Sequence, residues 1–120
     1  MKILYVEDSP VNLHAMKRIV THLGYEFIAA ESAQQGLEML EQVPDIILLD
    51  IGLPDMDGYQ LLTEIRKLNI AQPILAVTAH AMSGEREKCL SAGFDDYIAK
   101  PVGYEVMTNL LKRHTHIASQ

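Results

Sequence analysis

The sequence predicts a single α/β domain in which a doubly wound, five-stranded parallel sheet is covered by helices on both faces. Five short apolar runs alternate with segments whose apolar residues recur every three or four positions. Two of the runs, 46–49 and 74–77, are apolar at every position, which is typical of strands buried on both sides. Because crossovers between parallel strands are right-handed, ligands are expected beyond the carboxyl ends of the strands.

The strands are expected where apolar runs are bounded by polar or turn-forming residues. These runs are Lys2–Val6, Phe27–Ala30, Ile46–Asp50, Ile74–Thr78 and Tyr97–Ala99. Each is followed by a helical pattern, so the sequence reads as βα repeated five times.

The first helix has signals at both ends. Pro10 suits its first turn, with Asp8 or Ser9 as the N-cap, and Gly24 ends it. Its apolar stripe is formed by Leu13, Met16, Val20 and Leu23.

The later helices are marked in the same way. Ser32 and Gln35 have the spacing of a capping box for the second helix, Asp57 can cap the third, and Gly93 ends the fourth. The third and fifth helices carry apolar residues at helical spacing, namely Leu61, Ile65 and Leu68, and Val102, Val106 and Leu110.

Length and composition fit one globular domain over residues 1–120, with a polar tail at 114–120 that is expected to fray. Apolar residues make up 48% of the chain, and no run approaches the roughly 20 apolar residues of a membrane helix. The single cysteine, Cys89, indicates a reducing, cytoplasmic setting, and the net charge of −6 argues against nonspecific nucleic-acid binding. The histidines, including His114 and His116, are expected to be solvated rather than metal-bound.

Charged residues follow three of the apolar runs. Glu7 and Asp8 follow the first, Asp50 ends the third, and Lys100 follows the fifth, while Thr78 closes the fourth. Each has an ordinary explanation by itself, such as a helix cap for Asp8 or a solvated surface position for Lys100. Together, at the same edge of a parallel sheet, they predict one polar crevice.

This crevice has the chemistry of a magnesium and phosphoryl site. Mg²⁺ prefers oxygen ligands, which Asp8 and Asp50 could supply directly, Glu7 directly or through water, and Gly52 through its carbonyl group. An ionised aspartate can also attack phosphorus. Lys100 would neutralise a phosphoryl oxygen, and Thr78 would donate a hydrogen bond.

The chain resembles the receiver domain of two-component response regulators, the CheY-like family, from Lys2 to about Arg113. The resemblance rests on 6–8 (Val-Glu-Asp), 50–58 (Asp-Ile-Gly-Leu-Pro-Asp-Met-Asp-Gly), 77–79 (Val-Thr-Ala) and 99–101 (Ala-Lys-Pro) in this order. It implies a flavodoxin-like fold with strand order 2-1-3-4-5.

The resemblance also implies roles for the site residues. Asp50 would be the phosphoacceptor, receiving its phosphoryl group from a phosphohistidine, and Glu7 and Asp8 would hold Mg²⁺. Thr78 and Tyr97 would be the switch residues that alter the surface of the fourth helix, fifth strand and fifth helix. The protein would assist its own phosphorylation and dephosphorylation without being an enzyme in the usual sense.

Three further positions are implied by the resemblance. The bond between Lys100 and Pro101 would be the family's cis peptide. Gly52 and His80 occupy the positions that tune how long the phosphoryl group survives.

The expected partners are a sensor histidine kinase or a histidine phosphotransfer protein, and a downstream protein target on the switched surface. Neither direct nucleic-acid binding nor membrane insertion is expected. The start at Met1 and the polar tail favour a stand-alone response regulator, and a receiver excised from a hybrid histidine kinase is the alternative.

Other functions are less well supported by the residues. A small phosphatase with an aspartate nucleophile would need a second aspartate where Gly52 stands. A dinucleotide-binding domain would need a glycine-rich first turn, which Glu7-Asp8-Ser9-Pro10 does not provide. A receiver-like module that is never phosphorylated is disfavoured because the acidic residues, Asp50, Thr78 and Lys100 are all present.

Overall fold

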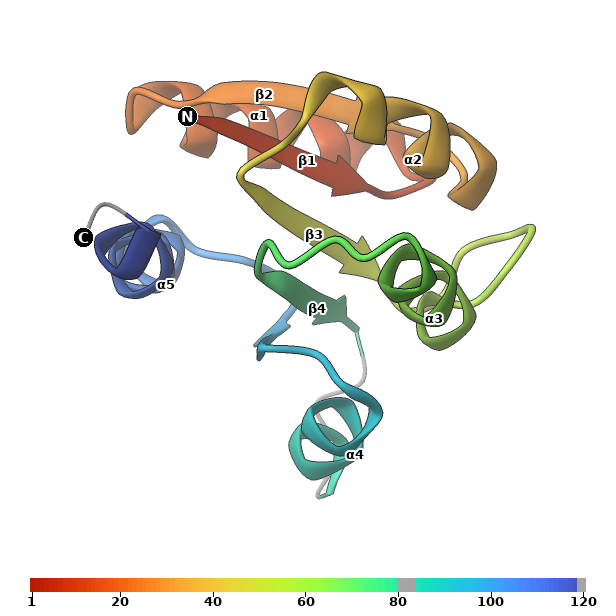
Figure 1. The fold of residues 1–120 in the computed structure, drawn as a ribbon. Coiled ribbons are helices and arrows are strands. Elements are labelled where there is room, and N and C mark those ends of the chain that lie inside the picture. Colours follow the sequence, from red (N-terminus) through yellow and green to blue (C-terminus); the bar gives the residue numbers. More distant parts are fainter. Residues whose placement is uncertain (80–83, 119–120) are drawn as a thin grey trace.

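The computed structural model describes residues 1–79 and 84–118, with the side chains of the last helix described as far as residue 114. Five strands and five α-helices alternate along the chain (Figure 1). The strands are β1 (Lys2–Val6), β2 (Glu26–Ala30), β3 (Ile46–Asp50), β4 (Ile74–Thr78) and β5 (Asp96–Ala99). The helices are α1 (Pro10–His22), α2 (Ala33–Met39), the 3-10 helix η1 (Leu40–Gln42), α3 (Gly58–Lys67), α4 (Glu85–Ala92) and α5 (Tyr104–Ala118).

The strands form one parallel sheet in the order β2-β1-β3-β4-β5, which confirms the predicted fold. β3 and β4 lie inside the sheet and are buried at every position, as their uninterrupted apolar runs predicted. The two strands that differ from expectation each begin one residue earlier, at Glu26 and Asp96.

Two apolar layers separate the sheet from its helices. On one face, α1 and α5 pack with Met16, Val20, Met107 and Leu110 against alternate residues of the strands. On the other face, α2, α3 and α4 cover a second layer that includes Leu61, Ile65, Cys89 and Phe94. The two layers fix the sheet rigidly between helices, so the carboxyl ends of its strands have defined positions.

The helix ends follow the sequence signals closely. Ser9, rather than Asp8, caps α1 with a 3.3 Å bond to the Asn12 amide, and Gly24 follows the helix with φ +92°. Asp57 and Gln60 form a reciprocal capping box at α3.

The cap of α2 differs from a reciprocal box. Ser32 accepts a hydrogen bond from the Gln35 amide, but the Gln35 side chain accepts from Glu31 N instead of from Ser32 N. Asp55, from the loop after β3, accepts from the amides of Ala33 and Gln34 and completes the cap. The loop after β3 is thereby tied to the start of α2.

α5 continues through Ala118, into the polar tail for which fraying was expected. The last described side chains of α5 contact Asp96, a buried carboxylate at the start of β5. Its Oδ2 atom is 2.7 Å from Arg113 Nη1 and 3.2 Å from His114 Nε2. The expectation that His114 is solvated is wrong, since its side chain is only 11% exposed and contacts this buried carboxylate. Burial raises the pKa of Asp96, but hydrogen bonds from the Tyr97 amide and from these two side chains outweigh burial and hold the pKa below its ordinary value.

Among the residues that the structure describes, no helix combines the length and the apolar character needed to cross a membrane.

Candidate functional site

The predicted site residues lie at one edge of the sheet, where four neighbouring strands end. β1 pairs with β3 so that Val6 lies beside Leu49, which places Glu7 next to Asp50. β4 pairs with β5 so that Thr78 lies beside Ala99, one residue before Lys100. The order of the central strands therefore gathers residues from 7 to 100 at a single edge (Figure 1).

Three carboxylates form the acidic part of the site. Glu7, Asp8 and Asp50 each offer an oxygen, and these oxygens all lie within 4.8 Å of one another. Glu7 is 1% exposed and Asp50 is 6% exposed, whereas Asp8 is open to solvent. Asp8 is therefore the member of the cluster that faces solvent.

Lys100 supplies the positive charge of the site. Its Nζ atom is 2.7 Å from Glu7 Oε1 and 3.3 Å from Asp50 Oδ1, so one ammonium group serves two buried carboxylates. Its backbone amide donates to Thr78 O at 2.8 Å, and the Lys100–Pro101 peptide bond is cis. Burial would lower the pKa of Lys100, but its bonds and its attraction to the two carboxylates raise it, so the side chain is a cation at neutral pH.

The two buried carboxylates hold their protons very differently. Burial, together with the hydrogen bond and repulsion from Glu7, raises the pKa of Asp50 to about 6, although Lys100 and the Gly52 amide oppose this. Burial acts in the same direction on Glu7, but hydrogen bonds with Asp50, Lys100 and Asn12 outweigh it and lower the pKa of Glu7 to about 2. Glu7 is thus the fixed charge of the pair, and Asp50 is the group that takes up a proton first.

The loop after β3 keeps Asp50 in place. The Gly52 amide donates to Asp50 Oδ1 over 3.4 Å, and the Gly58 amide donates to Ile51 O at 2.8 Å. A Cβ atom at Gly58 would lie 2.8 Å from both Asp50 O and the Cα atom of Ile51, so the loop can close this tightly only around glycine. Gly52 is exposed, and a Cβ there would meet nothing within 4 Å.

The expected switch residues occupy two different environments. Thr78 is 1% exposed at the end of β4, on the strand adjacent to Asp50. Tyr97 is half-buried on β5, and burial is the largest cause that raises the pKa of its hydroxyl, with smaller contributions from the nearby Cys89 and Glu85. His80, expected to tune the phosphoryl lifetime, lies outside the described residues.

Two site residues were missed by the sequence analysis. Tyr5 and Asn12 both donate hydrogen bonds to Glu7 Oε1, over 3.2 Å and 2.9 Å. A signal for Tyr5 was present, because residues two apart on a strand share a face and Tyr5 interrupts an otherwise aliphatic run. Asn12 had no such signal, since its contact depends on the angle at which α1 leaves the site.

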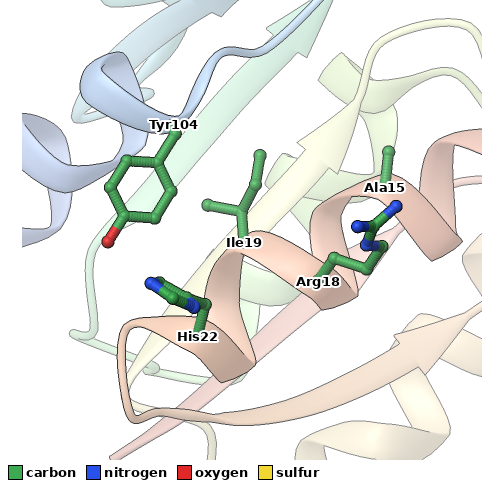
Figure 2. A pocket seen from close by; sticks show the side chains of 5 residues that line it. All are labelled: Ala15, Arg18, Ile19, His22 and Tyr104. Atoms are coloured by element: carbon green, nitrogen blue, oxygen red, sulfur yellow. The ribbon is translucent and has the colours of Figure 1, made fainter.

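An open hollow lies along α1. It has a volume of about 420 Å³ and is lined by Ala15, Arg18, Ile19 and His22 of α1 and by Tyr104. Figure 2 shows the Tyr104 ring facing the same side of α1 as His22, and the two rings meet edge to face with centroids 5.4 Å apart.

A smaller hollow connects this surface with the site. It has a volume of about 100 Å³ and shares Ala15 and Ile19 with the larger one, while Lys100 and Pro101 line its other side. The surface of α1 therefore leads from Tyr104 towards the acidic site.

The donor set fits a magnesium ion. Three carboxylates with oxygens inside 4.8 Å match the preference of Mg²⁺ for oxygen ligands, and the exposed side at Asp8 leaves room for water. Nitrogen or sulfur donors, which would favour zinc or copper, do not join this cluster among the described residues.

The fold and this site together define a receiver domain. The family model for the response regulator receiver domain matches residues 3–112, and the chain belongs to this family. Receiver domains act in two-component phosphorelay signalling as phosphoacceptors rather than as classical enzymes, and they interact with histidine kinases and downstream targets.

Curated relatives place the chain among longer signalling proteins. It is 41% identical over 117 residues to the signal transduction histidine-protein kinase BarA of Escherichia coli K12, covering 95% of this chain and 13% of BarA. It is 37% identical over 125 residues to the transcriptional regulatory protein PhoP of the same strain, covering 100% of this chain and 56% of PhoP. The chain thus spans only part of the length of these relatives.

Solved structures agree with this assignment. A CheY-like receiver domain protein from Methanospirillum hungatei JF-1 superposes with a TM-score of 0.88 at 34% identity, covering 98% of this chain and 95% of that one. The receiver domain of a sensor histidine kinase from Pseudomonas aeruginosa PAO1 has a TM-score of 0.82 at 39% identity, covering 96% and 97%. The latter was crystallised with a magnesium ion coordinated in its active-site cleft.

Proposed function

We propose that Asp50 accepts a phosphoryl group from a phosphohistidine on a partner sensor kinase or histidine phosphotransfer protein, with Mg²⁺ as cofactor. The observation that carries the proposal is the placement of one carboxylate, Asp50, between two acidic neighbours and a lysine ammonium 3.3 Å away. With a pKa of about 6, Asp50 is ionised at neutral pH and can act as the nucleophile.

The transfer moves one phosphoryl group between two side chains. A carboxylate oxygen of Asp50 attacks phosphorus, an O–P bond forms, and the P–N bond to the donor histidine breaks. The bonding electron pair goes to the imidazole nitrogen, which then takes a proton from solvent. Lys100 neutralises charge on the phosphoryl oxygens, so this cation moves from serving two carboxylates to serving one carboxylate and the phosphoryl group.

Glu7, Asp8, Asp50 and the carbonyl group of Gly52 would hold the metal. When bound, Mg²⁺ offsets the negative charge that the carboxylates and phosphoryl oxygens bring together. Glu7 suits this role because its pKa of about 2 keeps it ionised throughout the physiological range. Asp8 suits it because its carboxylate is exposed and lies at the open side of the cluster.

The phosphorylated state would change the surface formed by α4, β5 and α5. Thr78 would bond a phosphoryl oxygen, its loop would move, and Tyr97 would take a more buried position. Exposed apolar residues on this surface, Leu90 on α4 and Val106 on α5, offer contacts to a downstream protein. Equal NMR shifts around Tyr97 and α4 in the phosphorylated and unphosphorylated proteins would contradict this part of the proposal.

The phosphodonor would approach along α1. The hollows beside Ala15 and Ile19 lead from Tyr104 to Lys100 and Pro101, so a donor helix resting there has its histidine near the rim of the site. Ala15→Arg, which fills the shared part of both hollows, should slow labelling by a phosphorylated kinase and leave labelling by acetyl phosphate unchanged. Slower labelling by both donors would contradict this docking surface.

The direct test of the phosphoacceptor is mass spectrometry after incubation with acetyl phosphate and Mg²⁺. The wild type should gain one phosphoryl mass, and Asp50→Asn should not. Asp45→Asn is a matched control, because Asp45 lies just before β3, at the end of the strand opposite to Asp50. There its carboxylate accepts a hydrogen bond from the Lys2 amide. A wild type that stays unmodified, or an Asp50→Asn variant labelled as fully as the wild type, would overturn the proposal.

The stand-alone form of the protein is also part of the proposal, with a receiver inside a hybrid kinase as the alternative. An antibody against this domain distinguishes the two in cell extracts. A single band at the size of this chain supports the stand-alone form, and a much larger band supports the alternative.

A further inference from the structure

We propose that Tyr5 and Asn12 are positioning residues for the metal site, which hold Glu7 by one carboxylate oxygen and leave the other oxygen for Mg²⁺. This inference rests on the proposed function, because it concerns the same acidic cluster. It assigns roles to two residues that neither bind the phosphoryl group nor belong to the carboxylate set.

The hydrogen bonds of Glu7 are strongly unequal between its two oxygens. Oε1 accepts from the Tyr5 hydroxyl at 3.2 Å, from Asn12 Nδ2 at 2.9 Å and from Lys100 Nζ at 2.7 Å. Oε2 accepts a longer bond, 3.4 Å, from the Ser9 amide. Three donors saturate one oxygen, so Oε2 is the atom with lone pairs to offer to a cation.

The local structure explains why these two donors reach Glu7. Tyr5 lies on β1, two residues before Glu7, whose backbone continues the strand pairing through a bond to Ala30 O, so both side chains leave the same face. Asn12 lies in the first turn of α1, where its backbone N–H donates a hydrogen bond to Ser9 Oγ and fixes the backbone close to the site. Tyr5 and Glu7 are each 1% exposed, so water cannot easily replace the Tyr5 hydroxyl as a donor to Glu7.

The neutral donors matter most when Lys100 changes partners. Lys100 is shared between Glu7 and Asp50, and in the proposed reaction it turns to a phosphoryl oxygen. Glu7 would then share Lys100 with the phosphoryl group, while Tyr5 and Asn12 would serve Glu7 Oε1 alone. A buried carboxylate needs hydrogen bonds to stay ionised and ordered, so these two residues keep the ligand in place through the reaction.

The test compares Mg²⁺ binding in the wild type, Tyr5→Phe and Asn12→Ala by isothermal titration calorimetry. Residues that orient a metal ligand typically contribute 10–100-fold in affinity, and we expect each variant to bind Mg²⁺ about 10-fold more weakly. Tyr25→Phe is the control, because it removes a tyrosine hydroxyl at the opposite edge of the sheet, before β2.

A second measurement separates positioning from general loss of structure. The Mg²⁺ concentration that gives half the maximal rate of labelling by acetyl phosphate should rise about 10-fold in both variants. The rate at saturating Mg²⁺ should stay close to that of the wild type, since neither residue contacts the reacting atoms. A merely structural role would lower the saturated rate instead and would overturn the inference.

The outcomes distinguish this inference from the proposed function. Wild-type Mg²⁺ affinity in both variants overturns the positioning role even when Asp50 is labelled normally. If Tyr5→Phe does not fold, Asn12→Ala decides, because alanine is compatible with its half-buried helical position. If the wild type binds Mg²⁺ but is never labelled, the proposed function fails while the calorimetric comparison still decides the role of Tyr5 and Asn12.

Discussion

Asp50→Asn should stabilise the metal-free protein at neutral and alkaline pH. Asp50 has a pKa of about 6 in the folded protein against an ordinary value of 3.8. The folded protein therefore binds this proton more tightly than the unfolded chain does, and stability falls as the pH rises from about 4 to 6. Above that range the ionised Asp50 carries the full penalty, which an uncharged asparagine avoids.

The magnitude follows from the difference between the two pKa values. A difference of about 2 units at 1.36 kcal/mol per unit gives about 3 kcal/mol at pH 8, and roughly half of that at pH 5. Glu7, with a pKa of about 2, stays ionised over this interval and does not contribute to the change. The 3 kcal/mol is a ceiling, because asparagine loses the attraction between Asp50 and Lys100.

Urea unfolding in EDTA at pH 5 and pH 8 measures this effect. With an m-value of about 2 kcal/mol per molar urea, a gain of about 2 kcal/mol in unfolding free energy moves the urea midpoint by about 1 M. Added Mg²⁺ should stabilise the wild type more than Asp50→Asn, because the variant lacks one charged ligand. Mg²⁺ should therefore reduce the difference in unfolding free energy between the two proteins. Asp45→Asn controls for the loss of a carboxylate, because Asp45 lies directly before the same strand.

Two results would refute this reasoning. An Asp50→Asn variant no more stable than the wild type at pH 8 would show that the buried carboxylates do not destabilise each other. A gain of the same size at pH 5 and pH 8 would show that its origin is not the ionisation of Asp50.

Two further substitutions test the scaffold around the site. Gly58→Ala should lower the free energy of unfolding by about 1–3 kcal/mol and slow the labelling of Asp50, because the added Cβ meets backbone atoms at 2.8 Å. Gly52→Ala is the control for stability, since a Cβ there meets nothing within 4 Å. Equal urea midpoints for the two variants would contradict the steric argument. Tyr59→Phe removes the hydroxyl that lies 3.3 Å from Glu85 Oε1 and 3.5 Å from Cys89 Sγ on α4. It should lower the free energy of unfolding by about 1 kcal/mol and speed amide hydrogen exchange in α4. Exchange in α4 as slow as in the Tyr25→Phe control would show that the Tyr59 hydroxyl does not anchor the helix.

Most of the fold could be predicted because its local and long-range signals agree. The apolar runs of β3 and β4 are both too short for helices and too apolar for an exposed strand, so only a central position in a parallel sheet suits them. Caps at Ser9 and Asp57 need only neighbouring residues, so Asp57 was predicted directly and Ser9 as one of two candidates with Asp8. The contacts of Arg113 and His114 were missed because they depend on Asp96, a buried partner on another element.

The site could be predicted as a set of residues but not as a set of contacts. Strand ends in a parallel sheet meet at one edge, so the acidic residues and Lys100 were expected together. Which carboxylate Lys100 approaches more closely is decided by tertiary distances, 2.7 Å to Glu7 and 3.3 Å to Asp50, which no local pattern encodes. Asn12 was missed for the same reason, since its bond to Glu7 exists only once α1 has packed.

Under the proposed function, these contacts explain how one domain can keep a reactive carboxylate buried. Three donors stabilise Glu7 as an anion, and this leaves Asp50 as the carboxylate whose charge is least compensated. A group in that position gains most from any added positive charge or from conversion into an acyl phosphate held by Lys100. The distribution of hydrogen bonds around Glu7 therefore favours Asp50 as the group that reacts, although Glu7 lies beside it with the same functional group.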